Sequence, residues 1–241
     1  MSAPGVSAPG AGPRVPRTRV VLAALLRKEL TVELRSFEAV PAMTLFSVTT
    51  FVLFHFALSR NTLSGDLASG VLWVTLLFAA VLGINRLFVA DAEQGGFDGF
   101  LLSPADRSVL LYSKALTLLA YLVVLEVVAV PAFALLLLGP ALWPALPGLL
   151  AALALGDLGI VVIGTFVGAL AVRTSVRDLL GPMISLPLLV PVLLCAARLS
   201  SPLLGATHVG ALPLRWLATL ALYDLVFGLI TFAVFDFLLE D

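Results

Sequence analysis

Residues 40–58 read VPAMTLFSVTTFVLFHFAL and carry no charged side chain between Glu38 and Arg60. A helix needs about 20 apolar residues to cross the hydrocarbon core of a bilayer. Of the 241 residues, 61% are hydrophobic and 12% are charged, whereas an ordinary soluble domain is about 25% charged. A water-soluble core cannot hide this much apolar surface, so the sequence predicts an integral membrane protein.

Five further stretches have the same apolar character. Together with 40–58, they are the predicted spans: residues 67–85, 115–138, 148–172, 179–197 and 215–235. In lipid every backbone polar group must be satisfied within its own segment, so all six should be helices. The predicted fold class is therefore an all-α membrane protein, in which Pro131, Pro187 and Pro191 should kink the spans that contain them.

Two segments precede the first span. Residues 1–19 are rich in Pro, Gly, Ala and Ser and end with three arginines, a composition that predicts a disordered basic tail. Residues 20–38 place five apolar residues on one helical face beside mixed charge: Leu22, Leu26, Leu30, Leu34 and Phe37. This stripe predicts an amphipathic helix in the cytoplasmic interface, with a solvated helix packed on a partner as the alternative. Residues 39–241 then form the six-helix transmembrane domain.

Lys and Arg residues are distributed unevenly among the predicted loops. With the N-terminus inside, the outer segments hold only Arg60, Arg198 and Arg215 of the 14 basic residues. Because cytoplasmic loops carry the excess of Lys and Arg, both chain ends are predicted to be cytoplasmic. This orientation places three tryptophans near the outer interface, where such rings prefer to lie: Trp73, Trp143 and Trp216.

Three acidic residues fall near the middle of predicted spans: Glu126, Asp157 and Asp224. Ionisable residues in lipid are costly and are functional candidates, and no Lys or Arg is predicted inside a span to match them. The alternative is a protonated acid that hydrogen-bonds to a neighbouring helix and serves packing. The sequence leaves both interpretations open.

The sequence lacks the motifs of common catalytic and nucleotide-binding sites, including the P-loop, H-E-x-x-H and G-x-S-x-G. Cys195 is the single cysteine, so no intrachain disulfide or Cys-based metal cluster can form. His55 and His208 form a conceivable pair of axial haem ligands, but an interfacial and a loop histidine are the simpler interpretation. We expect no catalytic residue, no metal and no directly bound cofactor, and the net charge of −1 indicates no nucleic-acid partner.

The longest predicted inner loop, residues 86–114, contains the segment DAEQGGFDGFLLSPADR at 91–107. Gly95 permits a bend, and Pro104 would end a short helix after it. Between them, apolar residues at i, i+3 and i+4 would form a knob on one face: Phe97, Phe100 and Leu101. A short helix with this knob and acidic neighbours suits docking to a soluble partner at the cytosolic face.

Several segments form a larger pattern. Those around the loop are GVLWV (70–74), LGINRLF (82–88), EQG (93–95) and LLSP (101–104). The others are RKEL (27–30) with Glu33 and Arg35, the pair Glu126 and Pro131, and the ending FDFLLED (235–241). The pattern covers nearly the whole chain after residue 20. It resembles the CcmB family, which are membrane subunits of the ABC complex used in cytochrome c maturation.

The resemblance implies a non-catalytic, ABC-2-like exporter permease in the bacterial inner membrane. A separate cytoplasmic ATPase subunit would bind it and hydrolyse ATP, and a membrane subunit of the same complex would handle haem. A second copy of the chain is a further expected partner, besides membrane lipid. The loop would be the element that couples the permease to the ATPase, through Glu93, Gly95, Phe97, Asp98, Phe100, Leu101, Leu102 and Pro104.

The supply of candidate haem ligands is thin, so mechanical coupling to the ATPase is favoured over a haem channel. Two alternatives stay open. One alternative to the cytochrome c maturation permease is the permease of another ABC-2-type exporter, for a drug or a glycan. The other is a secondary transporter driven by protons through the three buried acids. An intramembrane enzyme is disfavoured because no catalytic pairing is visible.

Overall fold

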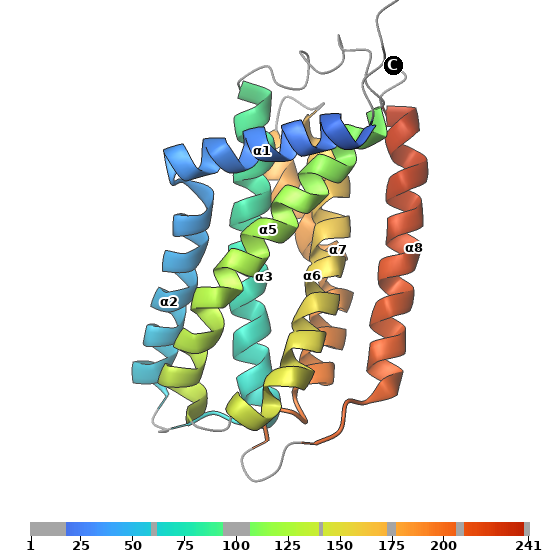
Figure 1. The fold of residues 1–241 in the computed structure, drawn as a ribbon. Helices are drawn as coiled ribbons and strands as arrows, with labels where there is room; N and C mark the ends of the chain where they lie inside the picture. The colour runs from blue at the N-terminus through green and yellow to red at the C-terminus, as the bar shows by residue number, and fades with distance from the viewer. Residues whose placement is uncertain are drawn as a thin grey trace, which may run out of the picture.

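The computed structural model describes residues 18–58, 62–93, 107–139, 142–172, 177–205 and 210–238. They form helices and short connections (Figure 1). The elements are α1 (Thr18–Ser36), α2 (Ala39–Ala57), α3 (Gly65–Glu93), α5 (Arg107–Phe133), the π-helix η1 (Ala134–Leu138), α6 (Leu142–Val172), α7 (Arg177–Ser200) and α8 (Leu214–Leu238). Six helices are long and apolar enough to cross a membrane: α2, α3, α5 with η1, α6, α7 and α8. The predicted all-α fold with six spans is confirmed.

The helix α1 lies across one end of the bundle, while the six spans run side by side from that end to the other (Figure 1). The last turn of α3, the first turn of α5, the last turn of α6 and the first turn of α7 all lie at the end that carries α1. The C-terminal end of α8 lies there too. The two ends of the described chain therefore share one face of the bundle, as an even number of spans requires.

Burial separates central helices from peripheral ones. The percentages that follow count buried residues in the most apolar 18-residue stretch of each helix. They are 72% in α3 and 61% in α6, but 22% in α2 and 17% in α8. Large apolar side chains on the peripheral helices are correspondingly exposed, such as Leu45 and Phe56 on α2 and Leu222 and Leu229 on α8. These exposed faces fit contact with lipid, and the packed centre forms around α3 and α6.

Glycines on α6 let α3 approach closely. A Cβ atom at Gly156 would overlap the Trp73 ring, and one at Gly168 would overlap the Phe88 ring. Small residues take this role where membrane helices pack, because lipid tails give no hydrophobic drive for association and van der Waals contact must supply it. The glycines therefore act as notches that receive the large side chains of α3.

The second predicted span ends too early, and the third begins too late. Helix α3 continues to Glu93, and α5 begins at Arg107, so both ends of the predicted loop 86–114 are helical. The stretch between these helices, residues 94–106, lies outside the described residues. Arg86 and Lys114, whose charges suggested a loop, lie within helices. Helices α3 and α5 both continue beyond the apolar stretches predicted as spans.

Trp73, predicted near the outer interface, faces the packed centre of the bundle and not its surroundings. Its side chain is only 1% exposed, and its indole N–H donates to Ser200 Oγ over 2.9 Å. A buried indole needs such a partner, and the bond ties α3 to the last turn of α7. Trp143, by contrast, is 76% exposed at the start of α6, and Trp216 is partly buried in the first turn of α8.

Candidate functional site

Of the residues predicted to dock the ATPase, the structure describes only Glu93, at the end of the bundle that carries α1. Glu93 is the last residue of α3. The others lie outside the described residues: Gly95, Phe97, Asp98, Phe100, Leu101, Leu102 and Pro104. The structure describes the helices on both sides of this connection, and these helices hold a polar cluster that the sequence did not reveal.

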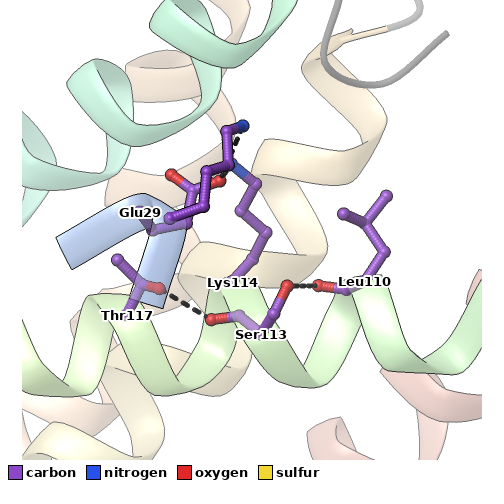
Figure 2. Close-up of polar contacts among 6 residues, drawn as sticks. Glu29, Leu110, Ser113, Lys114 and Thr117 are labelled. Atoms are coloured by element: carbon purple, nitrogen blue, oxygen red, sulfur yellow. Dashed lines mark hydrogen bonds and ion pairs between the residues drawn. The ribbon is translucent and has the colours of Figure 1, made fainter. Parts of the chain in front are cut away.

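An ion pair lies at the centre of this cluster (Figure 2). Lys114 Nζ on α5 is 3.0 Å from Glu29 Oε1 on α1, and the two side chains are 2% and 11% exposed. Lys28 Nζ lies 3.4 Å from the same Glu29 oxygen. Taking charges out of water is costly unless they are paired, so this contact fixes α1 against α5.

The buried pair also contacts α3. Lys114 Nζ lies 6.0 Å from the centroid of the Phe88 ring, which is within the range of a cation–π interaction. On α5, Ser113 Oγ donates to the carbonyl of Leu110 and Thr117 Oγ1 donates to the carbonyl of Ser113, each over 2.8 Å (Figure 2). These hydroxyl groups are satisfied by their own helix, so the ammonium of Lys114 is what joins α1, α3 and α5.

A second acid on α1 holds the start of the first span. Glu33 accepts hydrogen bonds from the backbone N–H groups of Ala39 (3.3 Å) and Val40 (2.8 Å). The first N–H groups of a helix have no partner within the helix, and a carboxylate there also meets the positive end of the helix dipole. Between the two helices the chain turns at Phe37, whose φ is +50°. Helix α1 is thus fastened to α2 as well as to α5.

Two of the three intramembrane acids meet. Glu126 on α5 and Asp157 on α6 lie near enough to interact electrostatically, and Asp157 is 3% exposed. Glu126 Oε1 has no hydrogen-bond partner among the described residues. A contact between two carboxyl groups is favourable when one of them carries a proton that it donates to the other. It also links two neighbouring spans.

Asp224 on α8 lies apart from this pair. Its carboxyl group faces Gly159 of α6, where an added Cβ atom would be 2.6 Å from Oδ1. Gly159 is two positions after Asp157, so the two residues point to different sides of α6. Both carboxyl oxygens of Asp224 are buried without a hydrogen-bond partner in the described part of the chain. The neighbouring Tyr223 donates instead to the carbonyl of Leu188, over 2.8 Å.

His55 is used by the fold. Its Nδ1 lies 2.6 Å from the carbonyl oxygen of Leu136, inside the π-helix η1. A carbonyl in a π-helix pairs with the N–H five residues later, and for Leu136 that residue is Ala141, which lies outside the described residues. Because a carbonyl oxygen can only accept, the imidazole donates through Nδ1. The other proposed haem ligand, His208, lies outside the described residues.

Within the described ranges no group of three or more His, Cys, Asp or Glu side chains could hold a metal ion. The polar pair that sequence reasoning missed is Glu29 with Lys114. A signal for it existed, because Ser113, Lys114 and Thr117 form a polar stripe on one helical face among leucines. That stripe indicates a buried polar contact more than a solvated loop.

Comparison with known proteins identifies the family of this chain over most of its length. The family model described as "CcmB protein" matches residues 20–238. A protein named "Heme exporter protein B" from Rhodobacter capsulatus is 33% identical over 177 residues, which are 73% of this chain and 80% of that protein. The protein of the same name from Pseudomonas aeruginosa is 31% identical over 202 residues, 83% of this chain and 89% of its own length.

A third such protein, from Bradyrhizobium diazoefficiens, is 31% identical over 223 residues, covering 86% of this chain and 93% of its own. The family model runs from α1 to the end of α8. The predicted resemblance is therefore confirmed, and the chain belongs to the CcmB family.

Proposed function

We propose that the chain is the membrane permease subunit of an ABC-type haem exporter that serves cytochrome c maturation. The observation that carries this proposal is the match to the family over residues 20–238, together with relatives named for haem export across most of their length. The chain has no P-loop, so a separate cytoplasmic ATPase subunit supplies ATP hydrolysis. Haem handling is assigned to a membrane subunit of the same complex.

The end of the bundle that carries α1 is placed in the cytoplasm. Support comes from the basic residues, since among the described ones only Arg198 and Arg215 lie at the other end of the bundle. Because Cys195 is the only cysteine and is buried, single cysteines can report orientation. Thr207→Cys should react with an impermeant maleimide in intact spheroplasts, and Ser36→Cys only after permeabilisation. The reverse pattern would overturn this placement.

The ATPase is proposed to act through residues 94–106, which connect α3 to α5. Phe88 and Lys114 lie on these two helices near that connection, and Lys114 holds Glu29 of α1. A displacement of the loop would therefore reach α1, α3 and α5 together. Through Glu33 it would reach α2 as well. This path supports mechanical coupling, in which the ATPase moves the bundle while haem is handled elsewhere.

The docking surface is proposed to be the apolar knob of the loop. Phe97, Phe100 and Leu101 would fill a groove on the ATPase, since a buried aromatic anchor often dominates an interface. Glu93 and Asp98 would tune specificity and association rate through charge.

A pull-down tests the proposal. Phe100→Asp places a charge in the knob, and Gly95→Val restricts the bend. Each variant should accumulate in the membrane at the normal level but fail to retain the ATPase subunit after solubilisation, and c-type cytochromes should disappear. Ala206→Asp, in an outer segment, is the matched control. It should retain the ATPase subunit and normal levels of c-type cytochromes. Full recovery of the ATPase with Phe100→Asp and Gly95→Val would place the docking surface elsewhere, with α1 the next candidate.

A further inference from the structure

The charges of α1 are sorted between its two faces. Both acids face the bundle, where Glu29 is bound by Lys114 and Glu33 by the first N–H groups of α2. The outer face of the helix carries Arg27 and Arg35, and they line a shallow groove together with small and apolar residues of the same helix and with Lys28, whose ammonium also lies 3.4 Å from Glu29 Oε1. That face consequently attracts anions, because its acidic neighbours are already neutralised inside.

A second, deeper groove lies where α1 meets α2 and α5. Its volume is about 620 Å³, which is within the range of about 300–1,000 Å³ typical of ligand pockets. Its lining is almost wholly apolar and includes Leu34, Phe37, Val40, Leu45, Val124 and Val128. Several of these side chains are open to the surroundings of the bundle, with Leu34, Phe37 and Leu45 each 67–70% exposed. Because the groove is bounded by two spans, it faces the bilayer.

We propose that this groove binds one acyl chain of an anionic phospholipid, whose phosphate is held by Arg35. Leu34 lines this groove and Arg35 lines the shallow groove on the outer face of α1, so both grooves reach the last turns of that helix. A guanidinium matches phosphate geometry through paired N–H donors. Arg27 extends the basic surface along the helix, and basic residues near a bilayer favour anionic over zwitterionic lipids.

The position of α1 favours a lipid over a protein helix as the occupant. Figure 1 shows α1 lying across the end of the bundle above α2 and α5. A partner helix that crossed the whole bilayer along this groove would run into α1. A phospholipid of one leaflet would not, because its chain ends within the membrane and its head group lies at the level of the interfacial helix.

Native mass spectrometry of the purified complex tests this binding. The delipidated complex is incubated with dioleoyl-phosphatidylglycerol or dioleoyl-phosphatidylcholine, and the lipid retained on the permease is counted. Wild type should retain one phosphatidylglycerol in preference to phosphatidylcholine. Arg35→Glu should lower that preference by about fivefold or more, and its control, Arg215→Glu at the opposite end of the bundle, should not.

Filling the groove provides the second test. Val124→Trp, or the milder Ala120→Leu, should abolish retention of both lipids, whereas Leu222→Trp on the exposed face of α8 should leave it unchanged. Thermal melting of each variant separates loss of binding from loss of folding, and Ala120→Leu decides if Val124→Trp unfolds. Equal retention of the two lipids by wild type would overturn the proposal, as would an unchanged preference in Arg35→Glu. If filling the groove instead releases a partner subunit or a second copy of the chain, the groove is a protein interface.

Discussion

Lys114 and Glu29 form an ion pair of 3.0 Å that joins the third span to the helix lying across the bundle. The ammonium is almost fully enclosed, and the Phe88 ring of α3 lies on its other side. Three helices therefore meet at one charge, close to the connection proposed to receive the ATPase. This contact is the structural reason to treat α1 as part of the coupling apparatus.

Removing the cation alone should destabilise the protein. Lys114→Met leaves the Glu29 carboxylate in a nearly closed site, and a buried charge that loses its partner costs about 3–5 kcal/mol. Lys28 lies 3.4 Å from the same carboxylate, so the low end of this range is expected. Size-exclusion chromatography after stepwise heating measures the loss. The double variant Lys114→Met with Glu29→Leu should regain most of the stability, and a double variant as unstable as the single one would show that the pair contributes little.

Glu126→Gln should be tolerated. The amide can still donate to Asp157, so the contact between α5 and α6 persists, and both protein level and cytochrome c maturation should stay near wild type. Glu126→Leu instead leaves Asp157 buried without its partner, at a cost of about 1–3 kcal/mol. Immunoblots of membranes and haem staining of c-type cytochromes check both results. Loss of maturation by Glu126→Gln at a normal protein level would mean that the carboxyl group must ionise, which would support a proton-driven mechanism.

His55→Ala should weaken folding and spare function. The carbonyl of Leu136 would lose its donor, at a cost of about 1–3 kcal/mol, and the melting temperature of the purified protein should fall. His55→Asn keeps an N–H donor, so its melting temperature should lie between those of His55→Ala and the wild type. Combined replacement of His55 and His208 by Ala should leave maturation largely intact at permissive temperature. Abolished maturation with normal protein level and an intact complex would instead indicate direct haem ligation.

Gly156→Ala tests the notch that receives Trp73. The new methyl group would overlap the indole ring, and overpacking of this kind typically costs about 1–3 kcal/mol. Gly228→Ala is the matched control on α8, because an added Cβ atom there meets nothing within 4 Å. Melting temperatures of the two variants should differ clearly, with Gly228→Ala close to wild type. Equal temperatures would show that α3 and α6 have room to adjust.

The spans were predictable because hydropathy measures transfer from water to an apolar medium, and all six segments pass that test. Hydropathy cannot distinguish which spans are central. A side chain that faces lipid and one that faces another helix are both apolar, so α3 and α8 look alike in sequence although their buried shares are 72% and 17%. The burial of Trp73 was missed for this reason.

For the candidate sites, the sequence identified individual residues but not the residues that they contact. Glu126, Asp157 and Asp224 were identified because charged residues are rare in apolar stretches, but their pairing depends on how α5, α6 and α8 face each other. Lys114 was assigned to a loop because it interrupts hydrophobicity. Only the position of Glu29, which is 85 residues earlier in the chain, explains why a lysine is stable there.

The notches on α6 bear on the order in which the protein is made. Ribosomes complete α3 long before α6, so Trp73 and Phe88 first enter the membrane with no glycine to receive them. The hydroxyl group that accepts from the Trp73 indole belongs to Ser200, at the end of α7, and arrives later still. Until α6 and α7 are inserted, helix α3 must therefore stay in lipid, or beside the insertion machinery, without the contacts that later bury Trp73 and Phe88. The centre of this bundle is assembled late in synthesis, around a helix that was inserted early.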